Sequence, residues 1–263
     1  RSSSVGESYP ASMPPGPVPI PKSADEALND PIFGDKWRES MMDDIHGKVE
    51  INKGWHLVKD LPPGRKAMKG KWVFKVLYND DGSVARFKSR WVGKGFTQVP
   101  HVDYHETYCS TLRAEIMRLF LAEAAASDNE LLEIDHIKAF TQGDMDDCEL
   151  YVEQPHGFVD PKYAACRLTK PLEGTCQAGH LFMVSNADTL ENKCGFNRSM
   201  TEPNIFWRER DGILIKIGVY VDNVLLSYPK GAAAKAQIDE VITVYKQRFN
   251  IDVRGPPREF MGI

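Results

Sequence analysis

Residues 70–98 alternate between apolar and polar side chains, and this period of two predicts a β-hairpin. The apolar positions of its first strand are Trp72, Phe74, Val76 and Tyr78. Asp80-Asp81-Gly82-Ser83 supplies a turn, and the return strand begins at Val84. On that return strand the alternation puts Arg86, Lys88 and Arg90 on one face and mostly Ala85, Phe87 and Trp91 on the other.

A period near 3.6 predicts helices elsewhere in the chain. Ser23 and Glu26 have the spacing of a capping box at the start of the first ordered helical region. The apolar stripes that follow are Trp37, Met41, Ile45 and Val49; then Ile116, Leu119 and Phe120 in a helix over 113–126; and finally Ile238, Val241, Ile242, Tyr245 and Phe249.

Two apolar strands lead to aspartates. The strand over 131–135 ends on Asp135, and 213–220, apolar on both faces, runs into a tight connection at 221–223 before a return strand over 224–228. Carboxylates at strand ends suit Mg²⁺, which prefers oxygen ligands, and two such ions roughly 4 Å apart assist phosphoryl transfer. Ordinary turn or strand-end aspartates remain the alternative, since these are frequent.

The charge is unevenly distributed. The whole chain of 263 residues carries a formal charge of −4, which alone argues against a polyanion partner. Yet residues 59–98 hold ten basic and three acidic residues, and 128–153 hold nine acidic and one basic residue. The basic block fits phosphates, although a solvated edge strand protected by lysines would look the same.

Other features bound the class of protein. The hydrophobic content of 42% supports a packed core. Five scattered cysteines without a C-x-x-C spacing favour a reduced intracellular compartment, and Cys176 with His180 is a weak zinc signal because no second close pair exists. The sequence shows no membrane-spanning run and no signal peptide, and it looks like part of a longer protein. The proline-rich residues 1–22 predict an extended linker.

Several strings resemble copia-type LTR-retrotransposon reverse transcriptases, in that family's order and over about 21–263. They are KWVFK at 71–75, the Asp81-Gly82 turn, FKSRWVGKGFTQ at 87–98, DY and ET at 103–107, Asp135 followed by AF at 139–140 and GD at 143–144, QPHGF at 154–158 and YVD at 220–222. Each motif is modest alone, and their order makes the set specific.

The resemblance implies an α+β fold: right-hand polymerase fingers at 23–127, with the basic hairpin 70–98, and a ferredoxin-like palm at 128–263 with an antiparallel sheet and packed helices. It also implies that the chain stops before the thumb. The expected activity is RNA-directed DNA synthesis by a two-metal mechanism with Mg²⁺, or with Mn²⁺. Carried over by position, Asp135 and Asp222 are the metal ligands.

The same resemblance implies roles for further residues. Lys88 and Arg90 lie near the triphosphate, Phe140 packs under the sugar or belongs to the core, and Gln177, after Gly174, supports the templating base pair or lies on a helix surface. The expected nucleic-acid-binding residues are Lys71, Lys75, Arg86 and Lys94.

The implied partners are a primed RNA or DNA template, deoxynucleoside triphosphates, and the rest of a Gag-Pol polyprotein, with integrase upstream and ribonuclease H downstream. No membrane partner is expected. The implied location is intracellular: the cytoplasm, in a virus-like particle, or the nucleus.

Departures from the family pattern suggest an ageing genomic copy. Asn223 stands where the family has a second adjacent aspartate, Ser110 where it has proline and His101 where it has glycine, and the neighbours of Gln177 also differ. The interaction between two unit charges 4 Å apart is on the order of 4 kcal/mol at an effective dielectric of 20, and Asn223 cannot make such an interaction with a metal ion. An inactive remnant that only binds nucleic acid is therefore the second hypothesis, and an unrelated metal-dependent hydrolase the third.

Overall fold

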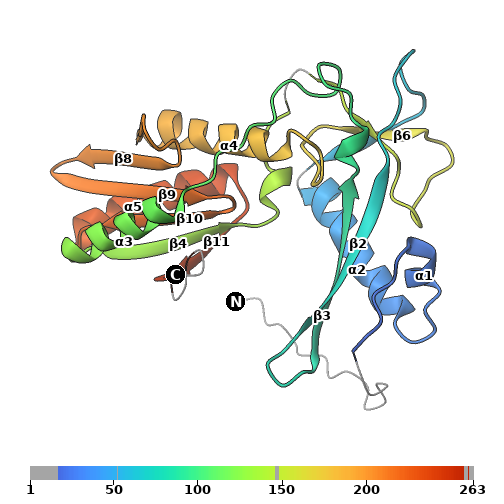
Figure 1. The fold of residues 1–263 in the computed structure, drawn as a ribbon, viewed down its shortest axis with the longest axis horizontal. Helices are drawn as coiled ribbons and strands as arrows, with labels where there is room; N and C mark the ends of the chain where they lie inside the picture. Colours follow the sequence, from blue (N-terminus) through green and yellow to red (C-terminus); the bar gives the residue numbers. More distant parts are fainter. Residues whose placement is uncertain (1–16, 52, 146–147, 258–259, 261–263) are drawn as a thin grey trace. The chain divides into compact units, whose positions relative to one another are not determined.

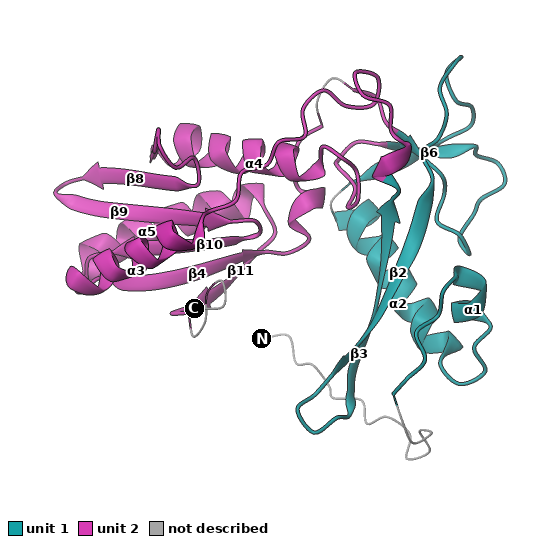
Figure 2. Ribbon diagram, viewed as in Figure 1, with its two compact units in different colours: residues 1–94, 151–167 teal, residues 95–150, 168–263 magenta. Residues whose placement is uncertain are grey.

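The fold is seen in a computed structural model that describes residues 17–51, 53–145, 148–257 and 260. It consists of two compact units, coloured separately in Figure 2. The first unit comprises residues 1–94 and 151–167, and the second comprises 95–150 and 168–263. The boundaries differ from the expected division at 127/128, because residues 95–127 belong to the second unit while 151–167 return to the first.

The first unit is built on the hairpin of β2 (Gly70–Tyr78) and β3 (Val84–Gly93), shown in Figure 1. Its remaining elements are α1 (Ala24–Leu28), α2 (Gly34–His46), the π-helical turn η1 (Gly47–Ile51) and a small sheet of β1 (Trp55–Val58), β6 (Ala165–Leu168) and β5 (Tyr151–Val152). Trp72 pairs across the hairpin with Trp91, and Phe74 with Ser89. The aromatic face is covered by α2, through ring contacts of Trp37 with Phe74 and Phe87.

The hairpin differs from the sequence prediction at its distal end. The register shifts between Leu77 and Tyr78, where Leu77 pairs with Arg86 and Tyr78 with Val84. This β-bulge leaves Ala85 exposed, although the simple alternation places it on the aromatic face. The bulge inserts one extra residue, which strict period-two counting cannot anticipate.

The outer edge of β3 is closed by side chains from α2 and η1. Ser40 Oγ accepts from Ser89 N (2.7 Å) and donates to Phe87 O (3.1 Å). Asp44 Oδ2 accepts from Trp91 N (2.8 Å), and Lys48 Nζ donates to Trp91 O (2.6 Å). Ser40 and Asp44, four residues apart on α2, therefore accept from the N–H groups of two strand residues that are two apart. Lys48, in η1, donates to the carbonyl of the second of these residues. The sequence did not predict these contacts.

The N-terminal segment also differs from its prediction. Residues 1–16 of the expected linker lie outside the described residues, but Val18 is buried and its N–H donates to the Tyr78 hydroxyl (3.0 Å). The capping box is half realised: Ser23 Oγ accepts from Glu26 N (3.1 Å), while the Glu26 carboxylate accepts from Lys22 N (2.8 Å) rather than from Ser23 N.

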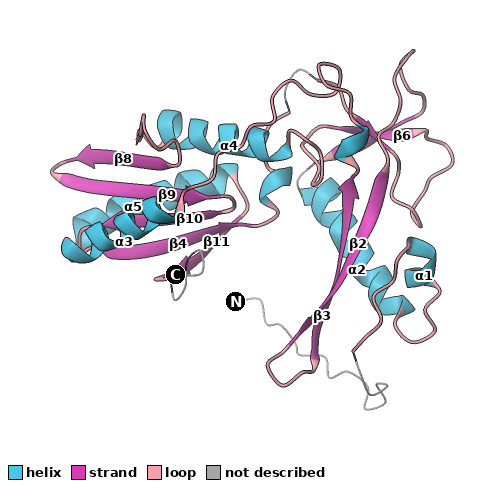
Figure 3. Ribbon diagram, in the orientation of Figure 1, coloured by secondary structure: helices cyan, strands magenta, loops and turns pink. Residues whose placement is uncertain are grey.

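The second unit contains a six-stranded sheet in the order β11-β4-β10-β9-β8-β7, with antiparallel pairings throughout. Its strands are β4 (Glu130–His136), β7 (Asn197–Arg198), β8 (Ile205–Arg210), β9 (Ile213–Tyr220), β10 (Asn223–Tyr228) and β11 (Ile251–Gly255). Its helical elements are η2 (Gly95–Thr97), α3 (Ala114–Ala126), η3 (Ala139–Thr141), α4 (Ala178–Asp188), η4 (Thr189–Lys193) and α5 (Ala232–Arg248). Figure 3 shows these helices beside the strands. The α+β class is thus confirmed.

Two apolar clusters hold this sheet. On one face, Val224 and Leu226 of β10 pack with Phe182 of α4 and Tyr245 of α5. On the other face, Leu225 packs with α3, where the inward side chains are Met117 and Phe120. Leu119 was expected to point inward but is 64% exposed, because the buried stripe of α3 runs through Met117, Phe120 and Ala124 instead.

Candidate functional site

Asp222 lies in a two-residue turn that joins β9 to β10. Tyr220 and Asn223 are paired partners on either side of it, so Asn223 is the first residue of β10 rather than part of the connection. Val221, inside the turn, has φ +55°. A β-branched residue is strained in this left-handed region, so the pairing of the flanking strands has to hold the turn in place.

Asp135 lies next to this turn, on the neighbouring strand β4. It is the partner of Asn223 on β10 and, on its other side, of Asp252 on β11. Directly paired residues of an antiparallel sheet share a face, so Asp135, Asn223 and Asp252 project from one surface. Strand β4 continues one residue beyond the expected end, to His136. The structure therefore brings the two predicted aspartates to neighbouring strand ends.

Arg254 of β11 compensates part of this negative charge. Its guanidinium contacts the carboxylates of Asp135 (2.9 Å) and Glu133 (3.0 Å). Burial nevertheless raises the pKa of Asp135; Arg254 lowers it in part, and the nearby charges of Asp222, Asp252 and Glu133 raise it further. Asp135 therefore sits in an acidic environment that a cation would stabilise.

The side chain of Asn223 bears on whether a metal ion fits. Its Nδ2 donates to Asp222 Oδ1 (3.1 Å). The other end of the amide, Asn223 Oδ1, is buried and has no hydrogen-bond partner. A buried amide oxygen without a donor is available to a hard cation, and Mg²⁺ needs only one or two protein carboxylates beside substrate phosphates. Among the described residues, no group of three or more His, Cys, Asp or Glu side chains is arranged to hold a metal ion.

His136 contacts the backbone of Asp222, and its side chain lies on the opposite face of β4 from Asp135. Its backbone N–H (2.9 Å) and its ring Nδ1 (3.0 Å) both lie against the Asp222 carbonyl oxygen. Because a carbonyl only accepts, Nδ1 carries the proton. Burial lowers the pKa of His136 from 6.5 to about 4, so the ring is neutral near pH 7. The sequence predicts no role for His136, whose only signal is its position directly after Asp135.

Phe140 is half-buried and Gln177 is buried. Phe140 in η3 is half-buried and packs against Phe182 with 6.4 Å between ring centroids. Gln177 is fully buried, so the surface-helix alternative is wrong. Its Oε1 accepts from Gln98 Nε2 (3.0 Å) and its Nε2 donates to Asp103 O (2.9 Å).

These contacts connect the end of the 87–98 motif to the segment that contains Gly174 and Gln177. Gln98 Oε1 accepts from Cys176 N (2.8 Å), and Gly95 N donates to Gly174 O (3.0 Å). A Cβ on Gly95 would lie 2.4 Å from that oxygen, so only glycine fits there. The Cys176 thiol contacts Gly95 O, and His180 Nδ1 lies 2.7 Å from Tyr108 O, so both side chains have partners within the protein rather than a shared metal.

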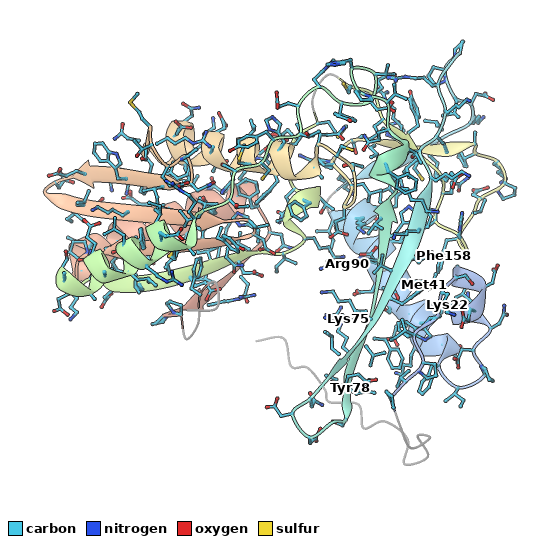
Figure 4. The ribbon with its side chains drawn as sticks, viewed as in Figure 1. Lys22, Met41, Lys75, Tyr78, Arg90 and Phe158 are labelled. Atoms are coloured by element: carbon cyan, nitrogen blue, oxygen red, sulfur yellow. The ribbon has the colours of Figure 1, made fainter. Side chains whose placement is uncertain are left out.

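The predicted nucleic-acid-binding residues lie on the hairpin of the first unit. Lys71, Lys75 and Arg90 are exposed, and Lys75 is the direct cross-strand partner of Lys88. Figure 4 shows Lys75 and Arg90 on the side of the hairpin away from Met41 of α2. Like charges placed opposite one another repel, which an anion would relieve.

Two predicted members differ from this group. The register is unshifted from Arg86 to Arg90, so Arg86, Lys88 and Arg90 share one face of β3 as predicted, but the Arg86 guanidinium pairs with Asp43 of α2 (3.0 Å). Lys94, the residue after β3, is half-buried, and its N–H donates to Lys69 O (2.8 Å).

Comparison with known proteins decides the family. Residues 52–263 match the model of a family described as reverse transcriptase (RNA-dependent DNA polymerase). The chain belongs to this reverse transcriptase family. The resemblance to copia-type retrotransposon enzymes that the motifs predict is thereby confirmed, and the unrelated-hydrolase hypothesis is abandoned.

Three relatives are retrovirus-related Pol polyproteins of plant transposons. The chain is 32% identical over 246 residues to that of transposon RE2 and 32% over 247 residues to that of RE1, both from Arabidopsis thaliana. It is 29% identical over 249 residues to that of transposon TNT 1-94 from Nicotiana tabacum. Each match covers 92% of this chain but only 16%, 16% and 18% of the relative, so the chain corresponds to one part of such polyproteins.

Within the described part, no helix is long and apolar enough to cross a bilayer.

Proposed function

We propose that this chain is an RNA-directed DNA polymerase domain of a retrotransposon Pol polyprotein, with the second unit as palm and the first as fingers. The observation that carries the proposal is the pairing of Asp135 with Asn223, directly after Asp222, at one end of the antiparallel sheet. Family membership supports the reaction class, and this strand pairing supports the choice of Asp135 and Asp222 as its site.

The chain's residues have defined roles in this proposal. Asp135 and Asp222 hold Mg²⁺ through carboxylate oxygens, and Asn223 Oδ1 adds a neutral oxygen. Bound Mg²⁺ would polarise the attacking hydroxyl and stabilise the leaving phosphate oxygens. The neutral His136 ring, by donating to the Asp222 carbonyl, fixes the strained turn that carries Asp222.

The exposed basic hairpin supplies the remaining interactions of the proposed enzyme. Lys88 and Arg90 neutralise the triphosphate, and Lys71 and Lys75 bind the nucleic-acid backbone. Gln177 contributes indirectly, by holding the loop that contains Gln98 and Asp103. Phe140, in η3, would pack under the sugar of the incoming nucleotide.

The proposal is tested by extension of a primed RNA template by the 263-residue chain. We expect weak Mg²⁺-dependent incorporation that Asp135→Asn abolishes. Asp239→Asn is the matched control, since this exposed aspartate pairs with Lys235 one turn away on α5 and its replacement should leave the rate unchanged. Equal extension by the parent chain and Asp135→Asn would contradict the proposal.

Binding without catalysis is the second candidate function. It is favoured by the neutral Asn223 and by the ion pair of Arg254 with Asp135. In that case the chain binds a primer–template duplex with an affinity that falls as salt rises. Replacing Lys75, Lys88 and Arg90 with glutamine should flatten the slope of log K against log[salt] by roughly 0.9 per lost phosphate contact. A parent chain that binds without salt dependence would contradict this candidate.

A further inference from the structure

The guanidinium of Arg254, on β11, forms an ion pair with the Asp135 carboxylate of β4. Its Nη2 lies 2.9 Å from Asp135 Oδ2, its Nη1 lies 3.0 Å from Glu133 Oε1, and its Nε lies 3.7 Å from Asp252 Oδ2. One guanidinium thus bridges carboxylates on two neighbouring strands. The side chains of Glu133 and Asp135 are 10% and 19% exposed, so these are not ordinary surface pairs.

The sheet geometry explains how Arg254 reaches them. Glu133 and Asp135 are two residues apart on β4 and therefore share a face. The pairing of β11 with β4 shifts register between Val253 and Gly255, which leaves Arg254 as the unpaired residue of a bulge. Bulges redirect side chains, and the planar fork of arginine suits two carboxylate oxygens at once.

We propose that Arg254 is the resident cation of the Asp135 carboxylate, and that a divalent metal ion must compete with it for that carboxylate. This inference rests on the proposed function, in which Asp135 is a metal ligand. Arg254 contacts Asp135 from the β11 side, while Asp222 and the unpartnered Asn223 Oδ1 lie on the β10 side. The same carboxylate is therefore shared between a fixed positive charge and the candidate metal ligands.

The competition has a direction. With Asn223 in place of a second adjacent aspartate, the β10 side lacks one negative charge, whereas the β11 side offers a complete guanidinium partner. Arg254 should therefore weaken metal binding by holding one Asp135 oxygen and by lowering the net negative charge at the site. Removing its charge should tighten metal binding without any added ligand.

The test measures Mn²⁺ affinity by the electron paramagnetic resonance signal of free Mn²⁺ in titrations of the full chain. Arg254→Gln should bind Mn²⁺ about tenfold more tightly than the parent. Arg254→Lys, which keeps the charge but loses the fork, should fall between them. Arg210→Gln is the matched control: Arg210 is 42% exposed against 45% for Arg254, and its ion pairs are with Asp211 and Glu240.

A second measurement detects Mn²⁺ binding even if Arg254→Gln lowers the stability of the fold. Melting temperature is recorded with and without Mn²⁺, and Mn²⁺ should raise it more in Arg254→Gln than in the parent. Adding Asp135→Asn to Arg254→Gln should remove the gain in affinity, which assigns the gain to this carboxylate.

The outcomes separate the inference from the proposed function. If Asn223→Asp tightens Mn²⁺ binding but Arg254→Gln does not, the role of Arg254 is wrong and the metal site stands. If Arg254→Gln and Arg210→Gln tighten binding equally, the effect is general electrostatics and the inference is wrong. If neither Asn223→Asp nor Arg254→Gln changes Mn²⁺ binding, both the inference and the proposed metal site are overturned.

Discussion

His101 adopts a left-handed backbone conformation, with φ +63°. The family resemblance expects glycine at this position, and the positive φ is the physical reason, because a residue with a Cβ is strained there. The substitution is tolerated because the loop is otherwise tied: His101 N donates to Tyr104 O (2.8 Å), and Val99 N donates to Asp103 Oδ2 (2.8 Å).

His101→Gly should therefore raise the free energy of unfolding by about 1 kcal/mol, measured by urea denaturation. His105→Gly is the control, since His105 does not have a positive φ, and it should lower the free energy of unfolding by up to about 1 kcal/mol. Equal effects of the two substitutions would contradict the strain at His101.

His136 makes stability depend on pH. Its pKa is about 4 in the folded state against 6.5 for the free side chain, because burial disfavours the charged ring. Between these values the unfolded chain binds the proton and the folded chain does not, so stability falls as pH is lowered from 6.5 towards 4. The part due to this residue is at most about 3 kcal/mol.

His136→Asn, which can keep a donor towards the Asp222 carbonyl, should flatten the pH dependence of unfolding between pH 4 and 6.5. The exposed His56 provides the control, and His56→Asn should leave the slope as it is. The assignment fails if the two variants show the same slope as the parent.

The residues of the candidate site were predictable to different degrees. Asp135 and Asp222 could be found because each follows an apolar strand and matches a family motif. Arg254 could not be found, because it reaches Asp135 only through a bulge in β11, and sequence does not specify register. The burial of Gln177 was also hidden, since an amide that bonds to Gln98 and Asp103 looks like any polar helix residue.

At the scale of elements, α2 and η1 protect the free edge of β3. Four helical residues advance about 6 Å and two strand residues about 6.8 Å, so Ser40 and Asp44 match the spacing of Ser89 and Trp91, while Lys48 bonds to the same strand residue as Asp44. Asp44 and Lys48 are 4% and 1% exposed and form an ion pair of 2.8 Å. The pair satisfies both backbone groups of Trp91 and removes the edge as a site for strand addition.

Asp44→Ala should cost about 3 to 5 kcal/mol of stability, because it removes the buried carboxylate that pairs with the Lys48 ammonium and accepts from Trp91 N. Chemical denaturation followed by tryptophan fluorescence measures this loss. Lys36→Ala, which breaks the exposed pair of Lys36 with Glu39, should cost less than about 1 kcal/mol. A loss at Asp44 no larger than that at Lys36 would contradict the role of the buried pair.

Periodicity predicted most elements and failed where an irregularity intervened. The hairpin strands and the buried stripe of α5 followed from period two and period 3.6, respectively. The bulge at Ala85 and the outward position of Leu119 did not, because both depend on how neighbouring elements pack. Polar residues facing a strand edge, such as Asp44, contradict the simple pattern of apolar residues inside.

At the scale of the whole molecule, the chain crosses between its two units more than once. Residues 151–167 return to the first unit, where Met68 N bonds to Tyr151 O (2.7 Å) and Trp72 Nε1 to His156 O (2.9 Å). A linear reading of motifs placed one boundary near residue 127 and could not detect this return. The net charge of −4 similarly conceals a basic hairpin in one unit and acidic strand ends in the other.

We propose that this chain has a polymerase active site that is weakened by the neutral Asn223. Two unit charges about 4 Å apart interact with an energy on the order of 4 kcal/mol at an effective dielectric of about 20. If this energy is lost in the transition state, the rate falls by roughly three powers of ten. Partial screening reduces this, so an increase of at least about 100-fold is expected when the charge is restored.

The most direct test is the rate of single-nucleotide incorporation on a primed RNA template with Mg²⁺, compared between the parent chain and Asn223→Asp. Asn223→Asp should raise this rate at least about 100-fold, and adding Asp135→Asn should abolish the gain. An unchanged rate in Asn223→Asp, or a gain that survives Asp135→Asn, would contradict the proposal.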